Sequence, residues 1–236
     1  MYSWVKETQF QDSKVCGMKK ILLVDDHPLI LEGYRMALMS DSEFAQSFVF
    51  EKAFDCTEAK QKIDQAIADK DPFDLALVDF SLPKGEESTW EDGGDIVRYI
   101  KKEMPICKTI TITGHTEVLT IYDIVKNIRP TSIIGKNEIT PPVLIDLVRV
   151  ILSGENYQSP LVKKCLEAMI CKEVMYDDYN RAILLLLAKG HKLIDLEHYV
   201  PLSAPTIKKR IAKMKTAFAV PDSATLVQEA IKLGFV

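Results

Sequence analysis

Acidic side chains stand at two points where short apolar runs end. Asp25 and Asp26 follow the run 21–24, and Asp79 follows the run 75–78. If both runs are parallel strands of one sheet, their carboxyl ends meet at one edge and bring the three carboxylates together. Like charges at close range repel each other, and a hard divalent cation with oxygen ligands neutralises them. A single acid after a strand is an ordinary helix cap, but three acids at one edge predict a Mg²⁺ site.

A hydroxyl and an ammonium group follow two further apolar runs. Thr113 ends the run 109–113, and Lys136 lies just beyond the run 132–134. A transferred phosphoryl group needs a hydrogen-bond donor and a fixed positive charge. Each residue alone is an ordinary strand or surface residue. At consecutive strand ends beside the acids, the two predict a site for a phosphoryl group.

The elements that must position these residues alternate between strand and helix patterns. Strands are expected at 21–24, 48–50, 75–78, 109–113 and 132–134, and helices at 29–39, 56–68, 95–103, 118–127 and 142–152. The first and third runs are almost continuously hydrophobic, which is typical of parallel strands covered on both faces. Five strands alternating with five helices predict an α/β doubly wound domain with a five-stranded parallel sheet.

The pattern changes beyond residue 152. Residues 153–175 are interpreted as a helical linker, and an all-helical module follows from residue 176. Helices are expected at 161–171, 179–189, 193–199, 204–218 and from Asp222 or Ser223 to 233. Ser203 is the expected cap of the helix 204–218. The predicted organisation is a disordered extension at 1–17, an α/β domain at 18–152, the linker at 153–175 and a small all-α domain at 176–236.

Charge and composition narrow the function classes. The net charge of −4 is uneven, because residues 172–236 hold 10 Lys and Arg against 7 Asp and Glu, whereas the rest holds 20 against 27. A mildly basic second module is a first hint of a nucleic-acid partner. No apolar run approaches the roughly 18–20 residues of a membrane helix. Five cysteines without a C-x-x-C pair predict reduced thiols of a cytoplasmic protein.

The first domain resembles the receiver domain of two-component response regulators over about residues 19–152. The resemblance rests on Val24-Asp25-Asp26-His27-Pro28, Asp79 in the sequence DFSLP, Thr113-Gly114 and Lys136. It implies a flavodoxin-like fold in which Asp79 accepts a phosphoryl group from a histidine kinase. The implied Mg²⁺ ligands are Asp25, Asp26, Asp79 and the backbone carbonyl of Ser81. Thr113 is implied to contact the phosphoryl oxygens, and Lys136 to pair with Asp79.

Two positions depart from the receiver pattern. Ile133 stands where the family usually has Tyr or Phe, so Val118 and Tyr122 are the alternatives for coupling the site to the surface. The loop after Pro83 is expanded to KGEESTWEDGG. We interpret this acidic loop as a tolerated surface insertion. The alternative is that it screens Asp79 from small phosphodonors or contacts the kinase.

The C-terminal module, from about residue 176 to 233, resembles the DNA-binding domain of NarL/LuxR-type regulators. The match runs through Ala188-Lys189-Gly190, Leu202-Ser203, Thr206-Ile207-Lys208 and Phe218-Ala219-Val220. It implies a helix-turn-helix with 193–199 as scaffold and 204–218 as the recognition helix in the major groove. The expected DNA contacts are Ser203, Thr206, Lys208, Lys209, Arg210 and Lys213, with Lys215 a weaker candidate.

Three residues depart from that pattern. Glu197 stands where a small residue is common, Arg210 where histidine is common, and Pro201 occupies the inter-helix turn. Glu197 and Asp195 place negative charge near the expected DNA side. The Glu197 departure and the small positive balance of residues 172–236 support an alternative in which DNA binding has decayed.

The two resemblances together predict a bacterial, cytoplasmic, DNA-binding transcriptional response regulator, switched by Mg²⁺-dependent phosphorylation of Asp79. Its expected partners are a histidine kinase, double-stranded DNA and a second copy of the chain at least when activated, with no membrane partner and no enzymatic role. The alternative is a receiver-based protein-interaction adaptor with a degenerate output domain or phosphorylation-independent control. A metal-dependent phosphohydrolase is less well supported, because Ser81, two residues beyond Asp79, supplies no general acid.

Overall fold

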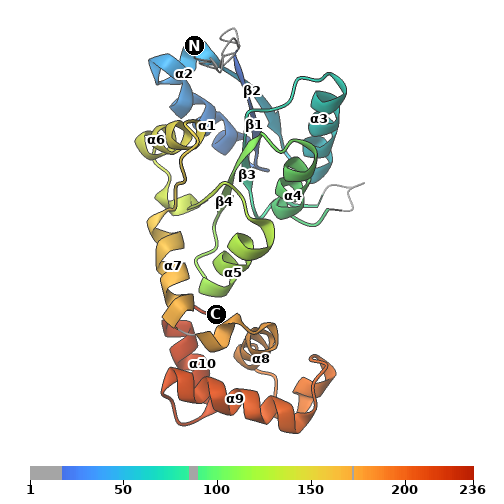
Figure 1. The fold of residues 1–236 in the computed structure, drawn as a ribbon, viewed down its shortest axis with the longest axis vertical. Coiled ribbons are helices and arrows are strands. Elements are labelled where there is room, and N and C mark those ends of the chain that lie inside the picture. The colour runs from blue at the N-terminus through green and yellow to red at the C-terminus, as the bar shows by residue number, and fades with distance from the viewer. Residues whose placement is uncertain (1–17, 85–89, 172) are drawn as a thin grey trace, which may run out of the picture.

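The computed structural model describes residues 18–84, 90–171 and 173–236. The predicted extension at 1–17 lies outside the described residues, as do residues 85–89 of the acidic loop. Figure 1 shows an elongated molecule with a sheet and its helices at one end and a group of helices at the other. Helix α7 (Pro160–Cys171) runs between the two groups.

Five parallel strands form the sheet. They are β1 (Lys19–Val24), β2 (Phe48–Ala53), β3 (Leu75–Asp79), β4 (Lys108–Thr113) and β5 (Ser132–Gly135). Their order is β2-β1-β3-β4-β5, and every neighbouring pair is parallel. The direction of strand progression reverses between β1 and β3, where doubly wound sheets hold their ligands. The predicted fold class is confirmed.

Helices cover both faces of the sheet. On one face lie α1 (Pro28–Met39), α2 (Ser42–Ser47) and α6 (Pro141–Leu152); on the other lie α3 (Cys56–Ala68), α4 (Gly93–Glu103) and α5 (Val118–Asp123). Alternate residues of β1 serve the two faces: Ile21 and Leu23 pack with α1 and α6, and Leu22 and Val24 pack with α3 and α4. This two-sided burial explains why β1 reads as a continuous apolar run.

Two helical segments on the sheet differ from the prediction. The helix expected at 118–127 is α-helical only to Asp123 and continues as a π-helical turn, η1 (Ile124–Ile128). Arg129 ends it with φ 54°, and its N–H donates to the carbonyl of Ile124. Pro130 follows, and the residue before a proline is disfavoured in the helical region. The short helix α2, capped by Asp41, was not predicted.

The second group of helices follows α7. It comprises η3 (Glu173–Tyr176), α8 (Asp178–Ala188), η4 (Leu193–His198), α9 (Ala204–Phe218) and α10 (Ser223–Lys232). The expected α-helix at 193–199 is a 3₁₀ segment that ends at His198, three residues before Pro201. Asp222 caps α10. No helix of the described part of the chain has the length and hydrophobicity to cross a membrane.

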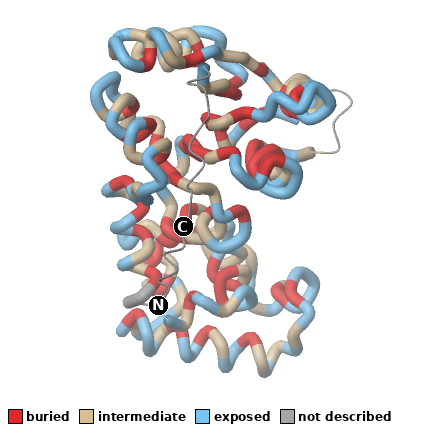
Figure 2. Tube along the Cα trace, turned by 45° about the horizontal axis from the view of Figure 1, so that its top comes forward, coloured by how far each residue is buried: buried red, intermediate tan, exposed pale blue. Residues whose placement is uncertain are grey.

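Buried apolar side chains run without a break from the sheet into the second helical group. The cluster on the α3–α5 face includes Val118 on α5, Cys165 on α7, and both Phe218 and Phe235 near the C-terminus. Figure 2 shows buried residues in the interior of both ends of the molecule and in the part between them. The Phe218 and Phe235 rings meet edge-on at 5.4 Å. The two groups of helices therefore share one core in this conformation.

The close approach of Gly93 to β3 generates a stability prediction. A Cβ added at Gly93 would lie 1.9 Å from the backbone oxygen of Asp79, whereas one at Gly33 in α1 would meet nothing within 4 Å. We expect Gly93→Ala to lower the free energy of unfolding by about 2–3 kcal/mol through overpacking. Gly33→Ala is expected to raise it by roughly 0.5–1 kcal/mol through helix propensity. Urea unfolding followed by circular dichroism measures both, and equal effects of the two variants would contradict the packing argument.

Candidate functional site

Two buried carboxylates share one ammonium group at the carboxyl ends of the strands. Asp25, after β1, is fully buried, and Asp79, at the end of β3, is 2% exposed. Lys136, directly after β5, places its Nζ 3.1 Å from Oδ2 of Asp25 and 2.9 Å from Oδ2 of Asp79. The sheet thus brings together three residues that lie up to 111 positions apart in the chain.

This arrangement shifts the pKa values of the buried groups. Burial raises the pKa of Asp79 above its ordinary 3.8, although Lys136 opposes the shift by hydrogen bonding and attraction. Partial burial acts to lower the pKa of Lys136, but Asp79 and Asp25 outweigh it and raise that pKa. Lys136 therefore stays charged, while one ammonium does not compensate fully for the burial of Asp79.

An exposed acid and a histidine stand beside the buried pair. Nδ1 of His27 lies 3.1 Å from Oδ1 of Asp25 and 2.8 Å from Oδ1 of Asp26. The hydrogen bond with Asp25 and the attraction of Asp26 raise the pKa of His27. Ligand atoms of these three residues lie within 4.8 Å of one another. Two carboxylates so close together fit a hard divalent cation, which needs few protein ligands.

The backbone after β3 approaches Asp79 from the side away from Lys136. The N–H of Ser81 donates to Oδ1 of Asp79 over 3.4 Å, a long bond. Oδ1 therefore has lone pairs that no strong donor occupies. The carbonyl of Ser81 belongs to the same turn and is the expected backbone ligand of a metal at this edge.

The hydroxyl of Thr113 is hydrogen-bonded within its own loop in this conformation. Thr113 is fully buried, and its Oγ1 accepts a hydrogen bond from the N–H of His115 at 3.0 Å. His115 in turn lies with Nε2 3.5 Å from Oγ of Ser81 and Nδ1 3.2 Å from Glu117. The loop after β4 thus links the turn after Asp79 to the start of α5.

The same loop contacts the C-terminal half of the chain. The backbone N–H of Val118 donates to the carbonyl of Gly234, two residues before the end of the sequence. The carbonyl of Thr116 accepts from Sγ of Cys165 on α7 at 3.9 Å. Movement of this loop therefore changes contacts to both α7 and the C-terminal residues.

Helix α5 and segment η1 make further contacts with the second helical group. The ring of Tyr122 lies 5.5 Å from that of Tyr176. Arg181 on α8 places Nη2 3.2 Å from Oδ1 of Asp123 and stacks over Tyr122 at 5.4 Å. Ile133 is buried in the same apolar cluster. Val118 and Tyr122, the alternatives for a coupling residue, both touch the C-terminal half.

The N-terminus of α9 is capped differently from the prediction. Ser203 stands at the N-cap position, but its Oγ pairs with Oγ1 of Thr206 at 3.0 Å rather than with a backbone amide. The carboxylate of Glu197, on η4, accepts the hydrogen bond of the Ala204 N–H instead. The residue that departs from the family pattern therefore acts as the cap.

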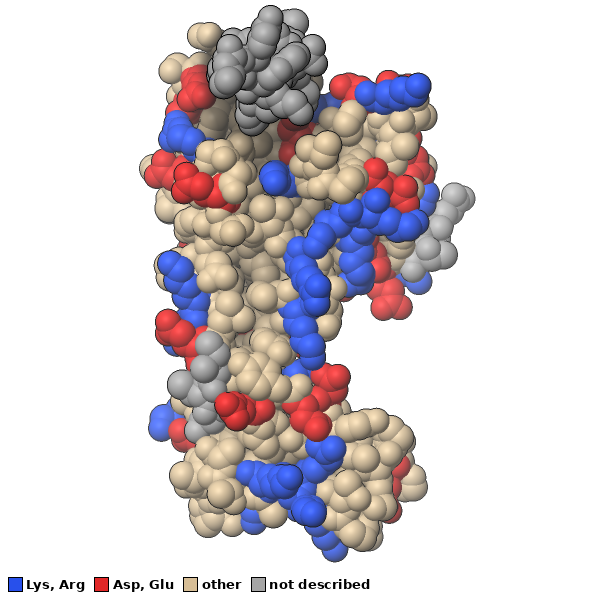
Figure 3. Space-filling model, viewed as in Figure 1, with Lys and Arg blue, Asp and Glu red and all other residues tan. Residues whose placement is uncertain are grey.

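Most of the basic residues predicted on α9 lie at the surface. Lys208, Lys209 and Lys213 are exposed. Lys215 donates from Nζ to the carbonyl of Pro221 at 3.1 Å, so it is turned toward the α9–α10 connection. Figure 3 shows Lys and Arg side chains at the end of the molecule that α9 forms, with Asp and Glu between this end and the sheet.

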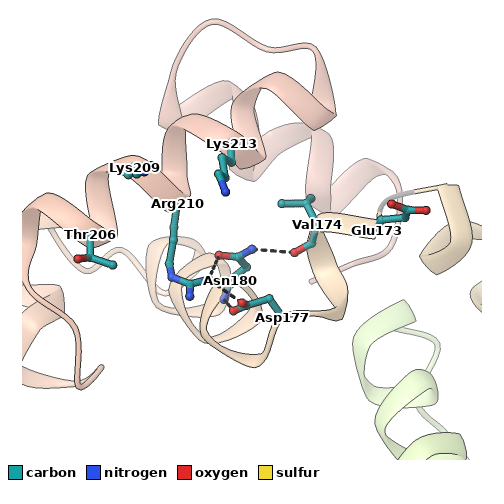
Figure 4. A pocket seen from close by; sticks show the side chains of 8 residues that line it. All are labelled: Glu173, Val174, Asp177, Asn180, Thr206, Lys209, Arg210 and Lys213. Atoms are coloured by element: carbon teal, nitrogen blue, oxygen red, sulfur yellow. Dashed lines mark hydrogen bonds and ion pairs between the residues drawn. The ribbon is translucent and has the colours of Figure 1, made fainter.

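Arg210 is directed inward, unlike the expected DNA contact. Its Nη1 lies 2.7 Å from Oδ2 of Asp177 and 3.0 Å from Oδ1 of Asn180, and its guanidinium stacks over Tyr179 at 5.4 Å. Figure 4 shows this pairing at the wall of a cavity of about 400 Å³ that Lys213 also lines. The physical reason is the spacing on α9: Arg210 follows the buried Ile207 by three positions and so faces α8.

Known proteins share this architecture. The chain is 25% identical over 233 residues to the transcriptional activator protein ExaE of Pseudomonas putida, covering 91% of this chain and 96% of that protein. It is 35% identical over 100 residues to the transcriptional regulatory protein ComA of Bacillus subtilis, covering 42% and 40%. RcsB from Salmonella enterica serovar Typhimurium, solved on a promoter with phosphomimetic BeF₃⁻, shares the fold with a TM-score of 0.60 at 18% identity, covering 90% and 98%. No family model matches the chain.

The predicted resemblance of the chain to two-component response regulators of the NarL/LuxR type is confirmed by these relatives and by the shared fold. The strand-end positions that carry its resemblance to a receiver converge in space at one edge of the sheet, with Lys136 in contact with both Asp25 and Asp79. The basic helix of the output module is α9, as the sequence predicts. The relatives are transcription regulators rather than enzymes.

Sequence reasoning did not identify two side chains at this edge of the sheet. His27 was considered only as part of the motif after the run 21–24, yet it contacts both acids after β1. His115 was not considered, although it lies two residues after Thr113. The same strand-end rule that selected Thr113 would have found it, because the loop after β4 lies at the same edge as the loop after β3.

The inward position of Arg210 generates a prediction for the output module. Arg210→Ala removes the partner of Asp177 and Asn180, so we expect it to lower the free energy of unfolding by about 1–2 kcal/mol. Lys208→Ala is the matched control on the exposed face of α9 and should change stability by less than about 0.5 kcal/mol. Urea unfolding measures both. If Arg210→Ala is as stable as the wild type, the contact with Asp177 does not stabilise the fold, and Arg210 can leave it at no cost.

The raised pKa of Asp79 generates a pH prediction. Because its pKa is higher in the folded chain than the ordinary 3.8, ionisation of Asp79 costs stability as the pH rises from about 3.8 through the folded value. Asp79→Asn removes that titration, so its stability relative to the wild type should increase over this pH range. Urea unfolding without divalent cations measures the trend.

A capping carboxylate supplies the control with the opposite sign. The backbone hydrogen bond from Thr225 lowers the pKa of Asp222, so Asp222→Asn should lose stability relative to the wild type as the pH rises toward 4. The same trend in both variants would show that Lys136 stabilises the charged form of Asp79 as fully as a cap stabilises Asp222.

Proposed function

We propose that this chain is a DNA-binding transcriptional response regulator whose switch is the Mg²⁺-dependent phosphorylation of Asp79. The observation that carries the proposal is the ammonium of Lys136 between Asp25 and Asp79 at the carboxyl edge of the sheet. In this proposal residues 18–152 are the receiver, 153–175 the linker and 176–236 the output domain. A histidine kinase and double-stranded DNA are its partners, and its place of action is the cytoplasm.

The acceptor atom is Oδ1 of Asp79. Lys136 holds Oδ2, whereas among the described residues Oδ1 receives only the long bond from Ser81, which leaves its lone pairs available to attack phosphorus. The new O–P bond forms as the P–N bond of the donor phosphohistidine breaks, and the electron pair of that bond returns to the imidazole. Lys136 orients the carboxylate. In the loop after β4, the hydroxyl of Thr113 would donate a hydrogen bond to the phosphoryl oxygens.

Magnesium would be held by Asp25, Asp26, Asp79 and the carbonyl of Ser81. The donor set fits because it consists of oxygens and because Lys136 neutralises only one of the negative charges of Asp25, Asp26 and Asp79. When bound, the cation neutralises the charge that accumulates as the phosphoryl group approaches a buried carboxylate. His27 must leave Asp25 and Asp26 to open their oxygens to a metal.

Coupling to the output domain runs through the loop after β4. A phosphoryl group that recruits the Thr113 hydroxyl competes with the bond from His115, and this loop also holds Thr116 and Val118 against α7 and Gly234. Phosphorylation would shift the population toward a state in which these contacts change. The state described here keeps them, so we assign it to the resting form.

DNA binding would use the exposed face of α9. Lys208, Lys209 and Lys213, with the hydroxyls of Ser203 and Thr206, supply phosphate and base contacts, and the guanidinium of Arg210 joins them only after leaving Asp177. RcsB, which shares the fold, is described as dimers bound to two parallel DNAs. By analogy we propose a homodimer on DNA. The adaptor alternative is less favoured because the relatives are transcription regulators.

The test is a titration with beryllofluoride and Mg²⁺ of the wild type and Asp79→Ala. We expect the wild type to change assembly state and to retain pooled genomic DNA at least about tenfold more tightly, because the mimic shifts the two-state equilibrium by roughly 1.4 kcal/mol or more. Asp79→Ala should not respond. Analytical ultracentrifugation and fluorescence anisotropy give the two readouts. Assembly without DNA retention would support the adaptor, and no response would remove Asp79 as the switch.

A further inference from the structure

The N-terminus of α9 already holds an anion. Glu197, exposed on η4, directs its carboxylate to the backbone N–H of Ala204, the first residue of α9. α9 spans Ala204–Phe218, 15 residues, so its dipole places a partial positive charge at that end. The carboxylate therefore occupies the most favourable anion position on the helix.

Little else in the first turn of α9 is satisfied from within the chain. Pro205 has no N–H, and the backbone N–H of Thr206 donates to no partner among the described residues. Ser203 and Thr206 bond each other through their hydroxyls. Hydrogen-bond donors at the start of α9 are thus available to a ligand from outside the chain. Glu197 is the one acidic group of the described residues that hydrogen-bonds to this end of the helix.

The start of α9 is the kind of position at which phosphate groups of a DNA duplex bind. Helix N-termini and short hydroxyl side chains are common phosphate contacts in protein–DNA complexes. The N-terminal end of a recognition helix also enters the groove first. A phosphate that approaches the start of α9 meets the charge of Glu197 and must displace its carboxylate or bind beside it.

We propose that Glu197 is an intramolecular competitor of DNA phosphate: its carboxylate takes the phosphate position at the start of α9 and lowers the affinity of the output module for DNA of any sequence. The inference rests on the proposed DNA-binding function. Because phosphate contacts carry no sequence information, the penalty falls on specific and non-specific DNA alike. Base contacts further along α9 must then supply the preference for an operator.

A purely structural role of Glu197 is the competing explanation. A cap at the start of α9 stabilises the helix, and its loss costs roughly 0.5–2 kcal/mol of stability. The two roles separate in Glu197→Gln, since the amide oxygen of Gln still accepts from Ala204 while the negative charge is gone. Glu197→Ala removes both the charge and the acceptor.

The matched control is Asp195→Asn. Asp195 lies on the same segment η4, and its carboxylate makes no hydrogen bond or ion pair within the part of the chain that the structure describes. Asp195→Asn changes the net charge by the same amount as Glu197→Gln. A difference between the two variants therefore reports the position at α9 rather than the overall charge.

The experiment measures binding of the full chain to a fluorescein-labelled duplex of mixed sequence by anisotropy, at salt concentrations from about 50 to 300 mM. We expect Glu197→Gln to bind about three- to tenfold more tightly than the wild type at the lowest salt, and the gain to shrink as screening increases. Asp195→Asn should bind within about twofold of the wild type. Glu197→Ala should also bind more tightly, despite the lost cap.

Three results would overturn the inference. Equal affinities of Glu197→Gln and Asp195→Asn would show that only the net charge matters. Weaker binding by Glu197→Ala, with wild-type affinity of Glu197→Gln, would make Glu197 a cap alone. No salt-dependent binding by the wild type or by any variant would remove the proposed DNA-binding function, and this inference with it.

Discussion

The ammonium of Lys136 between the carboxylates of Asp25 and Asp79 is the interaction on which the rest of this structure depends. It joins the ends of β1, β3 and β5, which are not all neighbours in the sheet, and both of its partners are almost completely buried. Two buried carboxylates without a counter-charge would be strongly destabilising. One ammonium leaves the group with a net negative charge, which is the condition that favours a cation beside it. Lys136 thus compensates enough charge for the chain to fold, and the remaining negative charge favours a bound cation.

The charge balance around Lys136 can affect the second helical group because the molecule has one continuous apolar core in this conformation. The cluster on the α3–α5 face extends through α7 to Phe218 and Phe235, so the loop after β4 lies between the carboxylate edge and the output helices. Its contacts to Cys165 and Gly234 are a few hydrogen bonds around this core. Packed cores have discrete arrangements rather than continuous ones. On the proposed function, a small change at Thr113 is therefore suited to select between two ways of docking the second helical group.

The sequence predicted what depends on strand ends and missed what depends on partners across the fold. The rule that parallel strands meet at one edge was sufficient to select Asp25, Asp79, Thr113 and Lys136, and the alternation of runs predicted the sheet. Short or irregular elements were missed: α2 has only six residues, and the residue patterns of η1 and η4 do not distinguish a π-helical or 3₁₀ segment from an α-helix. Arg210 was expected on the DNA side because its charge, not its partner, is visible in the sequence.

The two unexpected positions on α9 have a joint consequence for recognition. With Arg210 paired to Asp177, the outward face of α9 presents lysines, whose ammonium groups are compact, strongly hydrated charges on flexible stems. Such groups attract phosphate well but lack the rigid fork of arginine for two-point recognition of a base. Glu197 reduces the same phosphate attraction at the start of the helix. Both features lower the affinity of a single output module, so the second module of a dimer, or a rearrangement that frees Arg210, must supply what one α9 lacks. On the proposed function, this charge arrangement by itself lowers the affinity of the resting form for DNA.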